Sequence, residues 1–291
     1  RTASNTNDLR GKILRIHPEA DGSYTIPKGN LFAEGTGKTK PEIYSMGHRQ
    51  PWRIFVDSKT GWIFEGEVGP DAKEDSVNRG PRGSDEFNII KKPGNFGWPY
   101  FVAHNKAYWE FDFTTGKSVK PFESNKPVNT SEYNTGLRDL PAAEKVIIYY
   151  PYATSSKFPL TGTGGRSATG GPVFRKENFT GNAHIFPSYY EGKWFITDWM
   201  RGWINIVSID NLGNFVSMEQ FLPGKKFASP IDMQFGPDGH LYVLEYGSGW
   251  FQANENAKLT RIEYNAGNRK PVVKISANKL AGAIPFNVKL S

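Results

Sequence analysis

The apolar residues of this chain occur in short segments that are separated by polar turns rich in glycine and proline. Residues 51–67 and 230–245 share one order: a strand, a turn ending at Gly61 or Gly239, and a second strand that ends in an acid. Residues 191–198 repeat the turn and the second strand less completely. Because glycine tolerates the positive φ that tight hairpin turns require, each repeat predicts a β-hairpin.

A third strand is expected after each hairpin, at residues 85–90, 203–209 and 259–264, and residues 11–16 resemble another third strand. Antiparallel meanders repeated along a chain are typical of a β-propeller, whose blades bury their faces only against their neighbours. About three and a half blades are counted, whereas a closed ring has ~4–8. The sequence therefore predicts an all-β fold in which residues 1–264 form the C-terminal part of a β-propeller, with further blades preceding Arg1. A β-sandwich with accidental internal similarity is the alternative.

Two regions interrupt the repeat. Residues 101–145 contain polar turns with little periodicity and are interpreted as a long insertion between blades. Residues 265–270 are typical of a linker. The remaining residues, 271–291, are too few for an independent domain, so they are interpreted as the first strands of a following one.

Composition narrows the classes of function. The chain has no cysteine, which excludes disulfides, thiolate zinc sites and a cysteine nucleophile. The formal net charge of +7 comes from scattered basic residues. Nucleic-acid-binding proteins concentrate such residues on one element, so no nucleic-acid partner is expected. No apolar run approaches the ~18 residues of a membrane span, so none is predicted.

Two loops contain candidate chemistry. Arg49, just before a predicted strand, can hold a carboxylate or phosphate by bidentate hydrogen bonds. The neighbouring His48 is a candidate base or ligand, although a single loop histidine is more often structural. The carbonyls of Gly69 and Pro70, with acids nearby, suit Ca²⁺. The EF-hand spacing is absent, and a solvated acidic turn is the alternative.

Three further groups have both a functional and a structural interpretation. The glycine-rich segment 161–171 is a candidate anion-binding loop, but it fits no nucleotide-binding motif. The acids that end the repeated hairpins either line the mouth of the ring or anchor turns: Glu67, Asp198 and Glu245. Four tryptophans either stack on sugars or pack between blades: Trp98, Trp199, Trp203 and Trp250.

Four segments resemble, in order, the glucose/sorbosone dehydrogenase family: residues 47–51, 66–70, 85–90 and 93–99. The resemblance is specific over residues 40–100 and looser to residue 264. It implies a six-bladed β-propeller that uses pyrroloquinoline quinone (PQQ) and Ca²⁺ to oxidise aldoses at C1. Residues 268–291 resemble the opening of a PKD domain, an immunoglobulin-like β-sandwich.

The resemblance also implies roles for particular residues. The arginine of the family's Gly-His-Arg motif contacts the quinone, and the carbonyls of its Gly-Pro pair bind Ca²⁺; the matching positions are Arg49, Gly69 and Pro70. Arg201 is the nearest match to a basic residue that holds a quinone carboxylate. The family's catalytic base is a histidine of an earlier blade, expected before residue 1, so no catalytic residue is assigned here.

The chain also departs from the family. Residues 229–232 stand where the family has arginines. The segment 164–171 is more similar to a divergent bacterial branch that is fused to other extracellular modules. These departures concern the cofactor site rather than the fold.

Two classes of function follow. The leading hypothesis is quinone-dependent oxidation of a sugar or a related alcohol or aldehyde by a secreted, periplasmic or cell-surface propeller, with a separate electron acceptor. The alternative is a non-catalytic propeller that binds a glycan or a protein within a cell-envelope or secreted assembly. The unmatched arginines favour the alternative, and the two intact motifs favour the enzyme. A propeller hydrolase or lactonase that uses Ca²⁺ alone is a third interpretation.

Overall fold

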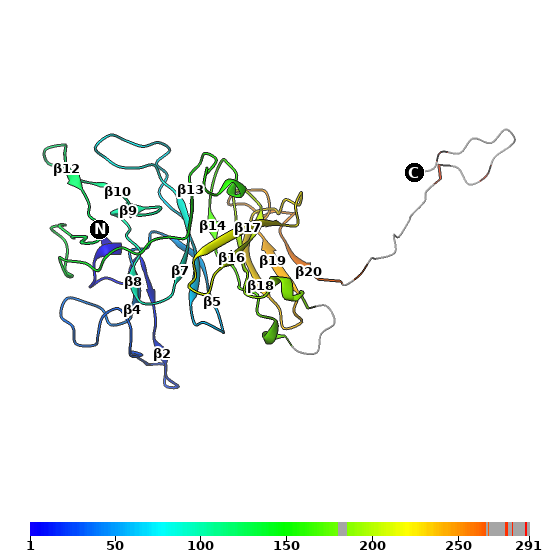
Figure 1. Cartoon of the computed structure of the whole chain (residues 1–291), viewed down its shortest axis with the longest axis horizontal. Helices are drawn as coiled ribbons and strands as arrows, with labels where there is room; N and C mark the ends of the chain where they lie inside the picture. The colour runs from blue at the N-terminus through cyan, green and yellow to red at the C-terminus, as the bar shows by residue number, and fades with distance from the viewer. Residues whose placement is uncertain (180–184, 266, 268–276, 279–280, 282–288, 290–291) are drawn as a thin grey trace.

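The computed structural model describes residues 1–179, 185–265, 267, 277–278, 281 and 289 (Figure 1). These residues form short β-strands and short 3-10 helices, and no α-helix occurs among them. The 3-10 helices are η1 (Thr2–Ser4), η2 (Pro159–Thr161), η3 (Lys176–Asn178) and η4 (Ser188–Tyr190). No helix in this part of the chain is long and apolar enough to cross a membrane. The predicted linker and PKD-like start, residues 265–270 and 271–291, lie mostly outside the described residues and stay predictions.

Three antiparallel sheets contain the predicted hairpin repeats, and their strands follow chain order. The first joins β5 (Pro51–Val56), β6 (Ile63–Glu67), β7 (Asp85–Ile90) and β13 (Ile148–Tyr150). The second joins β14 (Ala168–Thr169), β15 (Trp194–Asp198), β16 (Ile204–Ile209) and β17 (Phe215–Phe221). The third joins β18 (Pro230–Phe235), β19 (Leu241–Glu245) and β20 (Lys258–Ile262). The strands that end in the repeated acids, β6, β15 and β19, are each second in their sheet, so the repeat is confirmed.

A smaller sheet precedes these three. In it, β1 (Lys12–Leu14) pairs antiparallel with β4 (Ile43–Met46), and β4 pairs in parallel with β8 (Gly94–Asn95). A short hairpin of β2 (His17–Pro18) and β3 (Tyr24–Thr25) lies between β1 and β4 in the chain. Figure 1 shows the sheets following one another across the molecule, from β4 and β8 to β20. This succession of small radial sheets is the predicted all-β propeller architecture.

The segment predicted as an insertion, residues 101–145, contains two local hairpins. One pairs β9 (Phe101–Val102) with β10 (Lys106–Ala107), and the other pairs β11 (Trp109–Asp112) with β12 (Lys117–Pro121). The segment also contacts the start of the chain, because the backbone N–H of Leu137 donates to Thr6 Oγ1 at 2.8 Å. The pattern of apolar residues did not predict these hairpins.

The repeated acids have one structural role in common. Each accepts a hydrogen bond from a backbone N–H in the loop just before the first strand of its own sheet. The donors are Arg49 for Glu67, Ser167 for Asp198 at 3.0 Å and Ala228 for Glu245 at 2.6 Å. The structural interpretation of these acids is therefore confirmed: they fix the entry to each blade, because a buried carboxylate needs donors nearby.

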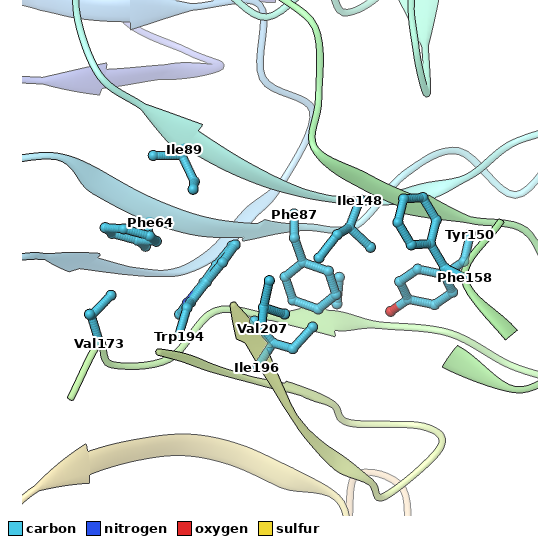
Figure 2. Packing of buried hydrophobic residues seen from close by; sticks show 11 residues of the cluster. Phe64, Phe87, Ile89, Ile148, Tyr150, Phe158, Val173, Trp194, Ile196 and Val207 are labelled. Carbon is cyan, nitrogen blue, oxygen red and sulfur yellow. The ribbon is translucent and has the colours of Figure 1, made fainter. Parts of the chain in front are cut away.

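The main hydrophobic core lies between the first two large sheets. Figure 2 shows Phe64 and Phe87 of β6 and β7 packed against Trp194 of β15. The Phe64 and Trp194 rings meet edge to face with centroids 5.0 Å apart, and the indole N–H donates to the carbonyl of Gly171 at 3.0 Å. Burying such rings contributes about 1.5–3 kcal/mol each. This interface explains why one blade requires its neighbour.

A buried ion pair joins the first two large sheets, between the residue that follows β5 and the residue that precedes η3. Arg175 donates from Nε and Nη2 to the two carboxylate oxygens of Asp57, both at 2.8 Å. The Asp57 side chain is fully buried. A bidentate pair of this kind fixes the orientation of one blade against the next as well as contributing energy.

Candidate functional site

Arg49 lies where the first large sheet begins, next to the loop that follows β6. Its Nη1 donates to the carbonyl of Val68 at 3.0 Å, and Nη2 lies 3.9 Å from Asp71 Oδ2. The guanidinium also faces the ring of Trp98, with its central carbon 5.9 Å from the ring centroid. The side chain is 28 % exposed. The Gly-His-Arg segment and the Gly-Pro segment are therefore neighbours.

His48 is turned away from solvent and is wholly buried. Its Nδ1 lies 2.9 Å from Glu65 Oε1 and 3.2 Å from Glu67 Oε2, and its Nε2 lies 2.8 Å from Ser45 Oγ. Its ring stacks on Phe96. Burial lowers the pKa of His48, but the charges and hydrogen bonds of Glu65 and Glu67 outweigh it and raise that pKa to about 10. A group so enclosed cannot act as a base on an external substrate.

Burial also shifts the acids around His48. It raises the pKa of Glu65 to about 7, and His48 offsets this only in part. It raises the pKa of Glu86 well above its ordinary value, with the charge of Glu67 adding to the effect. Burial also acts to raise the pKa of Glu67. The hydrogen bond from His48 and the positive charge of His48 outweigh burial, so the pKa of Glu67 is lowered. Carboxylates that share a water-free site cannot all ionise easily.

Pro70, one of the two predicted calcium ligands, has a carbonyl that contacts a buried arginine. The carbonyl of Pro70 accepts a hydrogen bond from Nη2 of Arg166, and Nη1 of Arg166 binds Asp85 Oδ1. Asp85 further accepts the backbone N–H groups of Gly69 at 2.9 Å and Ala168 at 2.8 Å. The Arg166 side chain is 1 % exposed and that of Asp85 is fully buried. A cation already lies against the carbonyl of Pro70, and the predicted calcium site at Gly69 and Pro70 stays a prediction.

Sequence reasoning missed the Asp85–Arg166 pair, because the two residues are 81 positions apart. One signal was available. Arg166 directly precedes Ser167, whose N–H is anchored by the acid of its blade, just as His48 directly precedes the acid-anchored Arg49. Burial lowers the pKa of Arg166 to about 10, yet the guanidinium remains charged at neutral pH.

Arg201 is held by backbone carbonyls. Its Nη1 donates to Thr161 at 2.6 Å and to Gly162 at 3.0 Å, and Nε donates to Gly165 at 2.9 Å. Its Nη2 donates to Pro151 at 2.8 Å and to Gly164 at 3.1 Å. The glycine-rich segment thus surrounds a cation with carbonyls instead of surrounding an anion with N–H groups. As arranged, Arg201 organises this loop, and its predicted grip on a quinone carboxylate stays untested.

An aromatic cavity of about 230 Å³ lies where the three large sheets meet. Gln50 and Trp52 come from the start of β5, Ile231 from β18, and Ser167 from just before β14. The loops after β15 and β19 complete it with Trp199, Tyr246, Trp250 and Phe251. The Trp199 and Trp250 rings lie 4.8 Å apart between centroids. Two of the four tryptophans singled out in the sequence therefore line a cavity.

The other two tryptophans do not line this cavity, and Trp98 lines a small pocket with Arg49 and Pro70. The indole N–H of Trp203 donates to the carbonyl of Thr161 at 3.0 Å, and its ring packs against Tyr150. Trp98 meets Tyr108 edge to face, with centroids 6.3 Å apart. Tyr150 in turn donates from its hydroxyl to Asp198 Oδ2 at 2.6 Å, and burial raises the pKa of that hydroxyl well above its ordinary value.

Comparison with known proteins gives a family match for part of the chain. Residues 1–136 match the family model described as Glucose / Sorbosone dehydrogenase. The chain is 24% identical over 245 residues to aldose sugar dehydrogenase YliI of Escherichia coli (strain K12), covering 84% of this chain and 50% of that protein. It is 34% identical over 119 residues to quinoprotein glucose dehydrogenase B of Acinetobacter calcoaceticus, covering 40% of this chain and 21% of that protein.

Among solved structures, a crystal structure of glucose dehydrogenase superposes with a TM-score of 0.53 at 20% identity. The match covers 91% of this chain and 57% of that one. At this identity the likeness shows the fold alone. The chain spans about half the length of these matched full-length proteins, or less.

Proposed function

We propose that this chain belongs to the glucose/sorbosone dehydrogenase family and is part of an enzyme that oxidises a sugar or a related alcohol or aldehyde. The proposal is supported by the family match of residues 1–136 and by the relatives' names, which describe aldose and glucose dehydrogenases. The observation that carries it in the structure is the aromatic cavity beside the Gly-His-Arg segment. Gln50, which lines the cavity, directly follows Arg49.

The cavity has the chemistry that a sugar requires. Sugars present apolar C–H faces that pack on aromatic rings and hydroxyl groups that need hydrogen-bond partners. Trp52, Trp199 and Trp250 supply the rings. Gln50 and Ser167 supply amide and hydroxyl groups at its rim. These residues would hold the sugar ring by stacking and hydrogen bonding.

A quinone is the cofactor class that we propose, because one relative is named a quinoprotein. When bound, a quinone accepts two electrons from the substrate and leaves the protein to provide binding and orientation. Arg49 is the residue of this chain that fits such an anion, because its guanidinium is partly exposed. Arg201 donates to six backbone carbonyls and contributes less. No step is assigned to calcium.

A non-catalytic sugar-binding propeller is the second candidate. It is favoured by the commitment of Arg166 and Arg201 to internal partners, which leaves fewer cations for a polyanionic cofactor. In that case the aromatic cavity binds a glycan without turnover. The two candidates share the cavity and differ in electron transfer.

The test measures binding and turnover on the same full-length protein. Dye reduction is followed with PQQ and a panel of aldoses, and sugar binding is followed by tryptophan fluorescence. Trp199→Ala is expected to weaken sugar binding by roughly tenfold or more, since loss of one stacking ring costs about 1–3 kcal/mol. Arg138→Ala, an exposed arginine far from the cavity, is the control. Binding without dye reduction would select the second candidate, and no binding of any sugar would contradict both.

A further inference from the structure

A buried polar face on β6 and β7 lies apart from the cavity. Glu65 and Glu67 are two residues apart on β6, so both side chains point to one face of the sheet. Across the strand pair, β7 places Asn88 opposite Glu65 and Glu86 opposite Glu67. His48 closes this face, with Nδ1 2.9 Å from Glu65 Oε1 and 3.2 Å from Glu67 Oε2. All of these residues are buried.

Some buried polar atoms on this face of the sheet have no hydrogen-bond partner. The second carboxylate oxygen of Glu65 and both polar atoms of the Asn88 side chain have no partner among the described residues. Leaving a buried polar group unsatisfied costs about 1–3 kcal/mol, and more for a charged one. Because Asn88 lies directly across from Glu65, its side chain points to the same face as the two carboxylates. His48 alone therefore does not satisfy the polar atoms of this face.

The other blades show that the fold does not require a carboxylate here. Glu67, Asp198 and Glu245 occupy equivalent positions, so the residue two before each is also equivalent. Those residues are Glu65, Ile196 and Val243. Ile196 and Val243 are buried apolar residues that pack in the core. An ionisable side chain at this position is specific to the blade that also contains His48.

We propose that His48, Glu65 and Glu67 bind a divalent transition-metal ion of the zinc class. One ligand atom from each of the three residues lies within 4.8 Å of the others. An imidazole nitrogen with carboxylate oxygens suits Zn²⁺ and its neighbours better than Ca²⁺, which prefers oxygen ligands alone. Asn88, across from Glu65, offers an amide oxygen as a further ligand.

The contacts around His48 and the charge of the site agree with this assignment. The hydrogen bond between His48 Nε2 and Ser45 Oγ, at 2.8 Å, fixes the imidazole so that Nδ1 faces the two carboxylates. A bound metal displaces the proton that His48 shares with these carboxylates, and two ionised carboxylates with a neutral imidazole then balance the charge of a divalent ion. The ion then joins the loop after β4 to the blade of β6 and β7, so its role is structural and separate from the sugar cavity.

The experiment measures metal content on the full-length protein. The protein is expressed with zinc supplied, desalted extensively and analysed by inductively coupled plasma mass spectrometry. About one equivalent of metal per chain is expected. Mutating a residue that only hydrogen-bonds to a metal ligand already reduces metal affinity about 10–100-fold. Glu65→Gln removes the charge of a ligand and keeps the shape of its side chain. This variant is therefore expected to reduce the metal content per chain by about tenfold or more.

Glu245→Gln is the matched control. It neutralises the blade-anchoring carboxylate of the last sheet that is equivalent to Glu67, and this carboxylate accepts hydrogen bonds from the backbone N–H of Ala228 and the hydroxyl of Thr260. This variant is expected to retain the metal. Circular dichroism verifies that both variants fold, and cobalt substitution is expected to give visible absorption bands in the wild type that Glu65→Gln lacks. Wild-type protein without metal and without zinc uptake, or Glu65→Gln with wild-type content, would overturn the proposal.

Discussion

Replacing Arg166 by methionine is expected to destabilise the protein strongly. The change removes the guanidinium that binds Asp85 and the carbonyl of Pro70, and leaves a fully buried carboxylate with only two backbone N–H donors. Removing one partner of a buried ion pair costs about 3–5 kcal/mol, because the other charge remains without compensation. Arg166 joins the loop after β6 to the loop before β14, so the substitution weakens the interface between two blades.

The magnitude is measured by urea unfolding of Arg166→Met, Asp85→Asn and the double variant. We expect each single change to cost about 3–5 kcal/mol and the double variant to cost clearly less than their sum. Arg82→Met is the matched control. It breaks an ion pair in which Arg82 Nη2 lies 2.9 Å from Asp75 Oδ2. Unlike the Arg166 pair, this one lies at the surface, with the Arg82 side chain 39 % exposed and the Asp75 side chain 61 % exposed. Such a surface pair is worth about 0–1 kcal/mol. If Arg166→Met costs no more than Arg82→Met, the guanidinium is not the buried counter-ion described here.

Three further predictions follow from the same geometry. Millimolar Ca²⁺ is expected to leave the Tm of the wild type unchanged, because Arg166 already lies against the Pro70 carbonyl; a saturable rise in Tm in differential scanning fluorimetry would show that the ion displaces the arginine. Asp57→Asn is expected to cost about 3–5 kcal/mol in urea unfolding, because it leaves Arg175 without its buried partner; a loss below about 1 kcal/mol would contradict the clamp between blades. Although burial raises the pKa of Asp57, hydrogen bonds from Arg175 and Thr60 outweigh it and lower that pKa. A lowered acid pKa adds stability above the unfolded value, near 3.9, that is lost as pH falls towards the folded value. Asp57→Asn should therefore flatten the acid limb of the stability–pH curve, and an unchanged limb would refute the assignment.

The sequence predicted the parts of this structure that depend on local pattern. Hairpins that end in glycine turns and acids gave the order of strands in three sheets, because turn chemistry and strand period act over a few residues.

The remaining features depend on contacts between distant segments. The pairing of Asp85 with Arg166 and of Asp57 with Arg175 crosses from one blade to the next, over 81 and 118 positions. No local period encodes such pairs. The glycine-rich loop was interpreted from its N–H groups, and only the position of Arg201 shows that its carbonyls face inward. The collection of aromatic residues from three sheets into one cavity likewise required the fold.

The most direct test of the central proposal, sugar oxidation, is to identify the product. Full-length protein is incubated with PQQ, an electron-accepting dye and an aldose that binds the aromatic cavity, and the sugar is analysed by mass spectrometry. The account predicts a lactone lighter than the aldose by two hydrogens, or the acid formed by its hydrolysis, in proportion to the dye reduced. A sugar that binds the protein and is recovered unchanged, with no dye reduced, would contradict it.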